Sequence, residues 1–545
     1  MNSRILIGCS VICSLVLLTA SAQTKRDATL PHLERRGGVT RLIVDGKPFI
    51  MLGGQVGNRS GTPERMAQVW PKLKAYNANT VEFPVYWNLI EPEEGKYDFS
   101  VSDQVIRDCR AHGLRAILLW FASNKCGRPQ NYPPKWVLSD TKRFPRIMDA
   151  SLKPAEPMSL LAETTLVVER NAYRAFMQHL KEIDGADHTV ILMQVENEPG
   201  LLGHARDYSP EATRLFNAAI PSALAAALHK KPGTWKEVFG PRSAEEASTA
   251  YYLATYINKL AKAGKEVYPL PTYVNVWMGG RGTNDRFYDF DRPGPSYPSG
   301  GPVSHMIDLW KAAAPDIDVI APDIYHRSPV IYRTILSRYT RRDNPLLIVE
   351  TGQGMPFARF CFSALVDYSG IGFAQYGVDA GGENRNALSD QFTDVGADYR
   401  LIGNAIPVIT QLQGTDKLKS AIEEEFISGR ELNFDRYDIL VKFPPAMNRR
   451  PGSPEPALPS YTPTGRTIIA QTGPDEFLIM GFNSAIDFKP ALGCGQENAK
   501  FTLVEDGSFE DGVWKTSATR DPGSAASDLK LSAEGAMVKV KLARY

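Results

Sequence analysis

Two carboxylates and an amide follow a strongly apolar run of the chain. The run at 190–193 is typical of a strand buried on both faces, and a Pro-Gly pair at 199–200 ends it. Glu196, Asn197 and Glu198 therefore stand where a buried strand stops. A single glutamate at such a place is usually a solvated strand end or a helix cap. A catalytic interpretation needs a second acid.

Glu350 supplies that second acid. It follows the apolar residues of PLLIV and precedes a Thr-Gly pair, so it also ends a predicted strand. Retaining hydrolysis of a glycosidic bond uses two carboxyl groups about 5 to 5.5 Å apart, one to protonate the leaving oxygen and one to attack the anomeric carbon. Along a regular strand Glu196 and Glu198 share a face, so spacing alone does not choose between them as the partner of Glu350.

Eight predicted strands alternate with helices and would position these acids. The strands are expected at 41–54 (a hairpin leading into the first strand), 79–87, 114–121, 189–198, 271–277, 318–325, 345–352 and 370–378. Helices between them carry one apolar stripe, as at Met66, Val69 and Leu73. This alternation favours an α/β fold, a closed (β/α)8 TIM barrel, and no Gly-rich nucleotide loop follows the first strand. Strands four and seven lie across such a barrel, so their acids can converge at its mouth.

Domain organisation follows from shifts in composition. Residues 1–22 combine Arg4, an apolar stretch and a small-residue end, which is typical of a signal peptide. LIGC at 6–9 resembles a lipoprotein box, but it precedes most of the apolar stretch, so lipidation is the weaker interpretation. The barrel is expected at 23–405 as the catalytic domain.

The C-terminal part, 406–545, has a different pattern. A proline-rich joint at 444–463 is followed by short alternating strands. This pattern predicts a small antiparallel β-sandwich as an accessory domain.

Three stretches together resemble glycoside hydrolase family 35, the beta-galactosidases. They are VYWNLIEPEEGKYDF at 85–99, TVILMQVENEPG at 189–200 and PLLIVETG at 345–352. The resemblance covers roughly residues 40–400 and is to a bacterial subgroup with a small beta domain after the barrel. It implies a secreted retaining exo-glycosidase that removes terminal beta-D-galactosyl residues, with plant cell-wall galactosides such as xyloglucan side chains as a substrate class.

The resemblance also implies roles for single residues. Glu198 matches the acid/base, Glu350 the nucleophile and Asn197 the amide that holds the sugar 2-hydroxyl. Tyr325 matches an aromatic residue that steadies the nucleophile, and Glu196 is left as a residue behind the site or in its wall. Aromatic side chains near strand ends that could stack on a sugar are Tyr86, Trp87, Trp120 and Trp277.

The chain departs from the family pattern at two places. Pro84 stands where many members have a tyrosine, and Gly54-Gln55-Val56-Gly57 replaces a Gly-Glu-x-His pattern. The galactose subsite should therefore be built differently. The loop at 279–301, rich in Gly, Pro and aromatic residues, is expected to form a wall for the leaving-group sugars.

Composition sets limits on partners and cofactors. Among 545 residues, 62 basic and 61 acidic side chains leave a formal charge of +1, which favours no nucleic acid or anionic membrane surface. No membrane span is expected beyond the signal. No metal or other cofactor is expected, because neither the histidines nor Cys109, Cys126, Cys361 and Cys494 have ligand spacing. The cysteines are expected to be small buried residues; their pairing and the oligomeric state stay open.

Two alternatives remain at this stage. The same carboxyl pair serves barrel hydrolases that remove beta-glucosyl, glucuronosyl or amino-sugar units. A secreted glycan-binding protein with an inactive barrel is the other, and the intact acids argue against it.

Overall fold

The computed structural model describes residues 30–127, 131–278, 292–379, 393–425, 427, 429–443, 463–492, 498–523 and 529–545. The expected signal segment, Cys494, residues 279–291 of the predicted loop and nearly all of the proline-rich joint lie outside the described residues.

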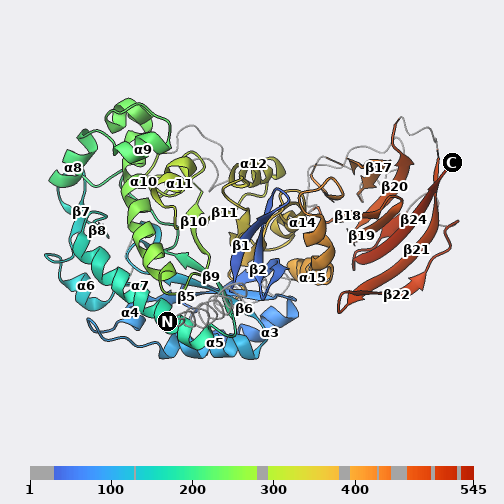
Figure 1. The fold of residues 1–545 in the computed structure, drawn as a ribbon, viewed down its shortest axis with the longest axis horizontal. Coiled ribbons are helices and arrows are strands. Elements are labelled where there is room, and N and C mark those ends of the chain that lie inside the picture. Colours follow the sequence, from blue (N-terminus) through green and yellow to red (C-terminus); the bar gives the residue numbers. More distant parts are fainter. Residues whose placement is uncertain are drawn as a thin grey trace, which may run out of the picture.

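A parallel sheet closes on itself in the N-terminal part of the chain (Figure 1). Its strands are β4 (Met51–Gln55), β5 (Thr80–Tyr86), β6 (Arg115–Phe121), β9 (Val190–Val195), β10 (Thr272–Trp277), β11 (Val319–Ile324), β12 (Leu347–Ile348), β13 (Glu350–Thr351) and β14 (Gly372–Tyr376). The short strands β12 and β13 are two halves of the seventh strand. Because β12 pairs with β14 and β13 pairs with β11, both in parallel, the sheet forms a closed ring. The predicted TIM-barrel fold is confirmed.

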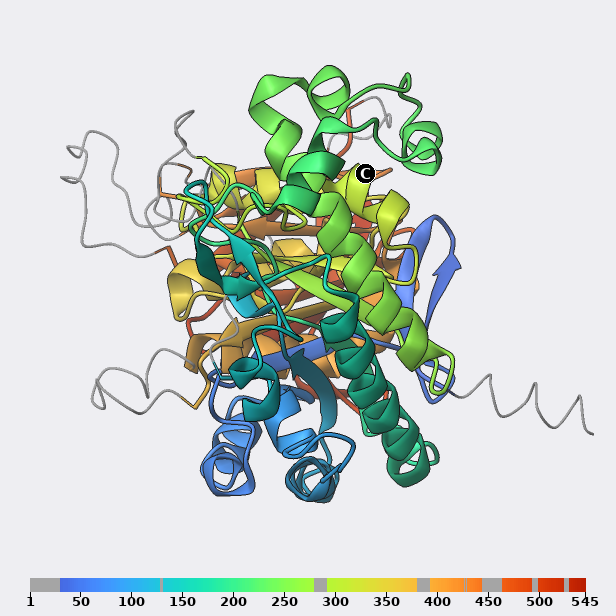
Figure 2. The ribbon, with the colours of Figure 1, turned by 90° about the vertical axis from the view of Figure 1, so that its left-hand side faces the viewer.

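Helices cover the outside of this ring (Figure 2). Helix α5, for example, buries Val105, Ile106 and Cys109, which lie on one stripe of its surface. The helices of this part are α2 (Pro63–Met66), α3 (Trp70–Ala75), α4 (Trp87–Ile90), α5 (Ser100–Ala111), α6 (Lys135–Ser139), α7 (Glu163–Asp184), α8 (Pro210–Asn217), α9 (Ser222–Ala227), α10 (Trp235–Lys265), α11 (Ile307–Ala313), α12 (Pro329–Tyr339), α13 (Met355–Ala358), α14 (Phe360–Val366) and α15 (Thr393–Leu412). A small hairpin, β7 (Arg146–Met148) and β8 (Pro154–Met158), lies between α6 and α7.

A three-stranded antiparallel sheet closes the amino end of the barrel. It consists of β1 (His32–Arg36), β2 (Val39–Val44) and β3 (Lys47–Phe49), and β3 leads directly into β4. Leu42 and Val44 join the apolar cluster inside the barrel. Asp45 accepts a hydrogen bond from Arg115 at the start of β6. The candidate site lies at the opposite end of the barrel, at the carboxyl ends of the strands.

Two antiparallel sheets follow the barrel. One has six strands in the order β15-β18-β19-β24-β21-β22, and the other has four in the order β16-β17-β20-β23. Both contribute to a second apolar cluster that includes Ile439, Phe477, Ile486 and Val538. The strands are β15 (Leu418–Ile422), β16 (Gly429–Asn433), β17 (Tyr437–Lys442), β18 (Arg466–Gly473), β19 (Glu476–Phe482), β20 (Ser484–Pro490), β21 (Ala499–Glu510), β22 (Val513–Thr519), β23 (Leu529–Leu531) and β24 (Ala536–Arg544).

Helices α14 and α15 lie between the barrel strands and the six-stranded sheet (Figure 1). Phe482 and Met480 of that sheet belong to the same apolar cluster as the barrel and its helices. Arg466 on β18 donates to Asp398 on α15 at 2.6 Å, and both side chains are buried. Helix α15 also runs across residue 405, at which we expected the barrel domain to end.

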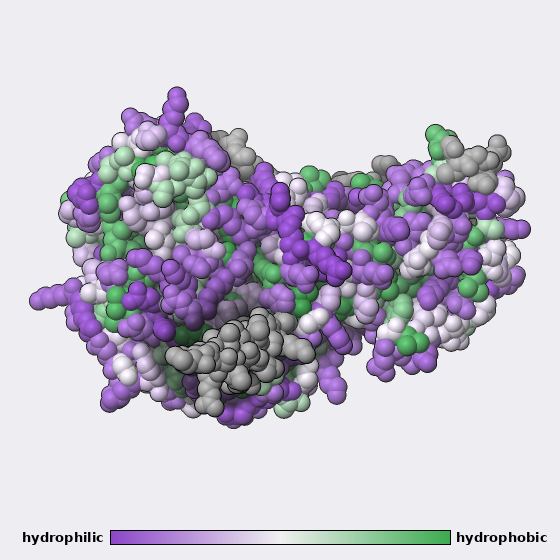
Figure 3. Space-filling model, viewed as in Figure 1, coloured by the Kyte–Doolittle hydropathy of each residue, from purple (hydrophilic) through white to green (hydrophobic). Residues whose placement is uncertain are grey.

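One face of the molecule is mainly polar (Figure 3). Figure 3 shows polar side chains over most of one face, with apolar side chains in scattered groups. In the described ranges, no helix combines the length and apolarity that crossing a membrane requires.

Candidate active site

The backbone changes direction immediately after β9. The strand ends at Val195, and Glu196 and Glu198 have φ angles of 64° and 43°. The left-handed conformation costs a residue other than glycine about 1–3 kcal/mol and is concentrated at functional sites. The prediction that the two glutamates share a face of a strand is wrong, because side chains alternate only along extended backbone.

Glu196 is fully buried on the side of β6. Its carboxylate accepts hydrogen bonds from the backbone N–H groups of Ala122 and Asn124, at 3.3 and 3.0 Å. Burial, and then the neighbouring carboxylate of Glu169, raise the pKa of Glu196 well above its usual range. Glu196 therefore holds the segment that follows β6, as a residue behind the site.

Glu198 points to the carboxyl-end face of the barrel. The Cys126 thiol donates to Glu198 Oε2 at 2.9 Å, and Asn197 Nδ2 donates to the same oxygen at 3.4 Å. Its backbone N–H donates to Asn275 Oδ1 at 2.7 Å. These contacts hold both the side chain and the backbone of Glu198.

Glu350 faces Glu198 from the other side of the ring. Its side chain accepts hydrogen bonds from the Tyr325 hydroxyl at 2.5 Å and from Gln55 Nε2 at 3.1 Å. Burial, and then the nearby charge of Glu198, raise the pKa of Glu350 to about 7, against the opposite effects of Tyr325, Lys125 and Gln55. A proton therefore stays in this carboxyl cluster below about pH 7.

A third carboxyl group, that of Asp323, joins the pair. One carboxylate oxygen each of Glu198, Asp323 and Glu350 lies within 4.8 Å of the others. By spacing alone the three could face a cation. The Lys125 ammonium and the donors on Tyr325, Gln55 and Asn275 already face these carboxyls, however, and carboxyl spacing of this kind also suits acid and nucleophile roles. The prediction of no metal stays a prediction.

Lys125 and Cys126 approach the carboxyls from the segment after β6. Lys125 is buried with its ammonium 5.0 Å from the centre of the Phe121 ring. Although burial alone would lower it, the adjacent Cys126 sulfur and the carboxylates of Glu198 and Glu350 raise the pKa of Lys125 above its usual range. Lys125 thus supplies a fixed positive charge beside the carboxyl cluster.

Asn197 belongs to a row of buried amides beneath the acids. Its Oδ1 accepts hydrogen bonds from Gln194 Nε2 at 3.0 Å and from Asn275 Nδ2 at 3.3 Å. Tyr325, at 39% exposure, is the open member of the cluster, while its hydroxyl is held by Glu350. The structure thus brings Glu198, Glu350, Asn197 and Tyr325 together, as the sequence interpretation requires.

The aromatic residues predicted to stack on a sugar differ in how far they are buried. Tyr86 ends β5 and stacks on Tyr132 with ring centres 5.9 Å apart. Trp277 ends β10 and is half-buried, next to the residues outside the described ranges. Trp87 and Trp120 are fully buried, and Trp87 Nε1 donates to Glu91 at 2.9 Å. A completely buried ring offers no face to a sugar, so we do not retain Trp87 as a binding residue.

Sequence reasoning did not assign several groups of this cluster to the site. They are Gln55, Lys125, Cys126, Asn275 and Asp323. Three of them carried a usable signal, since Gln55, Asn275 and Asp323 are polar residues inside strands that are otherwise apolar. Lys125 and Cys126 follow β6 in irregular backbone, where no periodicity points to a direction.

The described cysteines test the prediction that the cysteines are small buried residues. Cys109 and Cys361 are buried and free, which confirms it for both. Cys126 is also buried and free, but its thiol faces Glu198.

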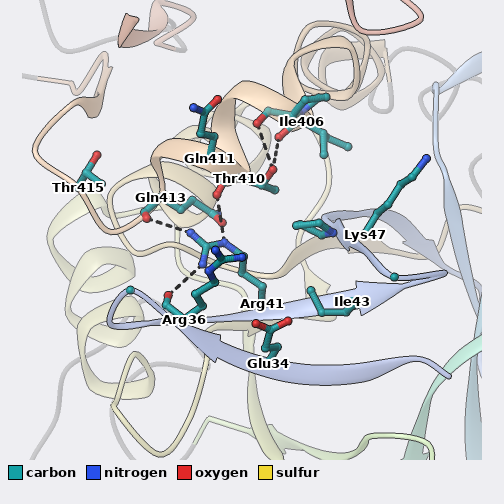
Figure 4. A pocket seen from close by; sticks show the side chains of 14 residues that line it. Glu34, Arg36, Arg41, Ile43, Lys47, Ile406, Thr410, Gln411, Gln413 and Thr415 are labelled. Atoms are coloured by element: carbon teal, nitrogen blue, oxygen red, sulfur yellow. Dashed lines mark hydrogen bonds between the residues drawn. The ribbon is translucent and has the colours of Figure 1, made fainter. Parts of the chain in front are cut away.

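A cavity of about 740 Å³ lies at the other end of the barrel (Figure 4). It is lined by the three-stranded sheet and the end of α15. Arg41 inside it donates to the backbone carbonyls of Arg36, Thr410 and Gln413. The guanidinium therefore satisfies carbonyls at the end of a helix, and none of the predicted site residues reaches this cavity.

The comparison with known families gives one match within the barrel and one in the C-terminal part. Residues 59–239 match a beta-galactosidase family. This family is glycoside hydrolase family 42. The predicted similarity to beta-galactosidase-type glycoside hydrolases is therefore confirmed, and membership of family 35 is not. Residues 395–520 match a domain family of unknown function, DUF5597.

Individual relatives match part of the chain. The chain is 26% identical to a beta-galactosidase of Xanthomonas manihotis over 232 residues, which is 37% of this chain and 35% of that protein. It is 31% identical over 189 residues to the human beta-galactosidase-1-like protein 3, covering 32% and 25% of the two chains. The matches thus span about a third or less of these relatives. Among solved structures, a Marinomonas beta-galactosidase superposes with a TM-score of 0.47 at 12% identity, over 67% of this chain and 60% of that one.

Proposed function

We propose that the protein is a retaining glycosidase that removes terminal beta-D-galactosyl residues, with Glu198 as acid/base and Glu350 as nucleophile. The observation that supports it most strongly is the convergence of these two carboxyls, with an oxygen of each within 4.8 Å of the other, on the carboxyl-end face of a barrel. Sequence similarity to beta-galactosidases covers Glu198 and its strand and supports the choice of sugar.

The assignment of roles follows from the donors around each acid. Tyr325 and Gln55 donate hydrogen bonds to Glu350, and such donors favour its charged form. The form that reacts is therefore the one in which Glu350 is charged and Glu198 carries the proton. Glu198 gives this proton to the glycosidic oxygen while a Glu350 oxygen attacks the anomeric carbon, and the bond to the leaving group breaks.

The second half of the reaction reverses these roles. Once Glu350 is an ester its charge is gone, so Glu198 ionises readily. Glu198 then takes a proton from water as the water oxygen attacks the anomeric carbon, and Glu350 departs as a carboxylate. Two inversions at one carbon give net retention. Asn197, beside Glu198, is proposed to bind the sugar 2-hydroxyl.

The finer features of the function are also proposals. Membership of family 35 rests on the three motifs, and plant cell-wall galactosides such as xyloglucan side chains are proposed as the substrate class. Export to the periplasm or outside the cell is proposed from the residue pattern at 1–22. Fractionation of cells that express the full chain tests export: a product that stays in the cytoplasm with residues 1–22 uncleaved contradicts it.

A panel of nitrophenyl glycosides tests the activity and the sugar together. We expect the beta-D-galactoside to be hydrolysed fastest and Glu350→Gln to lower kcat by roughly 10⁴-fold. Glu91→Gln is the matched control, because Glu91 is a buried carboxylate that accepts hydrogen bonds from Trp87 Nε1 and the backbone N–H of Gly95, outside the carboxyl cluster, and its loss should leave kcat unchanged. A preference for beta-glucoside, glucuronide or amino-sugar substrates would replace the galactosyl assignment. No turnover of any glycoside would favour a glycan-binding protein.

A further inference from the structure

The position of Asp323 follows from the strand register. Asp323 on β11 pairs with Glu350 on β13, so in this parallel sheet their side chains leave from neighbouring strands at the same level. Asp323 is 2% exposed. Its carboxyl group contacts that of Glu198 as well, and it therefore lies against both proposed catalytic groups.

One amide ties Asp323 to Glu198. Asn275 Oδ1 accepts a hydrogen bond from the backbone N–H of Glu198 at 2.7 Å, and Asn275 Nδ2 donates to Asp323 Oδ2 at 2.8 Å. The other carboxyl oxygen of Asp323, Oδ1, has no donor facing it within the described part of the chain. Glu198, itself an acid, also lies within reach of the Asp323 carboxyl.

Two carboxyl groups in buried contact attract each other only if a proton lies between them. The charges around Asp323 agree with a proton there. Burial, followed by the charges of Glu350 and Glu198, raises the pKa of Asp323 well above its usual range, and Lys125 opposes this. The phenols of Tyr273, Tyr325 and Tyr339 complete its polar surroundings.

The charge balance of the cluster leads to the same result. Three ionised carboxyls beside Lys125 would leave an uncompensated negative charge in a buried place, which is costly. A proton on Asp323 and one shared by the glutamates leave a single carboxylate opposite the ammonium. The cluster is then neutral, and the catalytic pair keeps the one proton its reaction needs.

We propose that Asp323 is a positioning residue whose protonated carboxyl donates a hydrogen bond to Glu198 and holds it at its working distance from Glu350. This inference rests on the proposed function. It predicts that Asn replaces Asp323 well, because an Asn Nδ2 donates to Glu198 while its Oδ1 accepts from Asn275. Ala does neither.

The kinetic test compares these two variants across pH. We expect Asp323→Asn to keep kcat/KM within about fivefold of the wild type without moving the alkaline limb of the pH profile, and Asp323→Ala to lower kcat by about 10- to 100-fold. Asp207→Asn is the control, because it removes another buried carboxyl outside the cluster. Thermal unfolding of each variant, and active-site titration with a slow substrate, correct the rates for any unfolded protein.

Two kinetic results would overturn the proposal. One is a loss in Asp323→Asn as large as that in Asp323→Ala. The other is a shift of the alkaline limb to lower pH in Asp323→Asn, since that shift requires the wild-type residue to carry a negative charge.

Infrared spectroscopy at neutral pH separates this inference from the proposed function. A protonated carboxyl band should be present in the wild type without substrate and should weaken in Asp323→Asn. An inactive wild type with this band contradicts the proposed function alone. If the wild type is active and the band is equally strong in the wild type and in Asp323→Asn, only the role of Asp323 is contradicted.

Discussion

At the scale of single residues, the shared proton of Glu198 and Glu350 controls the pH dependence. The pKa of Glu350 is raised to about 7, largely by burial and then by the charge of Glu198. Above that pH both carboxyls are charged and no proton remains for the leaving oxygen. We therefore expect kcat/KM for a galactoside to fall as the pH rises above about 7.

Glu198→Gln gives the sharper form of this prediction. Removing the Glu198 charge lowers the pKa of Glu350, so ester formation should persist to lower pH than in the wild type. The measurement is the pH dependence of the burst of dinitrophenol from a dinitrophenyl galactoside, which needs no acid for its leaving group. An acid limb that stays in place or moves up contradicts the coupling.

Tyr325→Phe tests the group that stabilises the charge of Glu350. Loss of the hydroxyl should lower kcat by about 10- to 100-fold and move the alkaline limb to higher pH, because this donor lowers the pKa of Glu350. Tyr332→Phe is the matched control, since the Tyr332 hydroxyl contacts Thr351 instead of Glu350. Equal effects of the two substitutions would show that the hydroxyl of Tyr325 acts only through packing.

The sequence predicted part of this residue-scale picture. Glu198 and Glu350 were found because each follows a long apolar run, which shows where a buried strand ends. The direction of Glu196 was not found, since it depends on left-handed backbone that no side-chain pattern encodes. Trp87 was placed in the site because it stands next to a strand end, and the first turn of α4 buries it instead.

At the scale of elements, the barrel strands were predictable because each is an apolar run bounded by turn residues. The division of the seventh strand into β12 and β13 was not, because it reflects pairing with β14 on one side and β11 on the other. Helix α15 likewise extends past the predicted boundary at residue 405, since its apolar face is covered by a sheet that begins later in the chain.

The ion pair between α15 and β18 is the element contact most open to test. Asp398→Ala should lower the free energy of unfolding by about 3–5 kcal/mol, because it leaves the buried Arg466 guanidinium without its partner. Urea denaturation measures this loss. The exposed pair of Arg214 and Glu211 serves as a control, and Glu211→Ala should cost less than about 1 kcal/mol. Equal losses in the two variants would contradict the role given to the buried pair.

At the scale of the whole molecule, the barrel and the six-stranded sheet share one apolar cluster through α14 and α15. Parts that share a core unfold together, so we expect one cooperative transition for the full chain in calorimetry. Deleting the chain after Leu412 should expose the apolar faces of α14 and α15 and yield protein that aggregates or binds ANS. Two well-separated transitions, or a soluble and fully active truncated barrel, would contradict a shared core.

The central claim is that Glu350 is the carboxylate that bonds to the sugar. Incubation with a 2-fluoro-galactoside that carries a good leaving group, followed by digestion and peptide mapping, measures this directly. The account predicts one label, on Glu350, and slow recovery of activity as the ester hydrolyses. A label on Glu198, on Asp323 or on any other residue would contradict it.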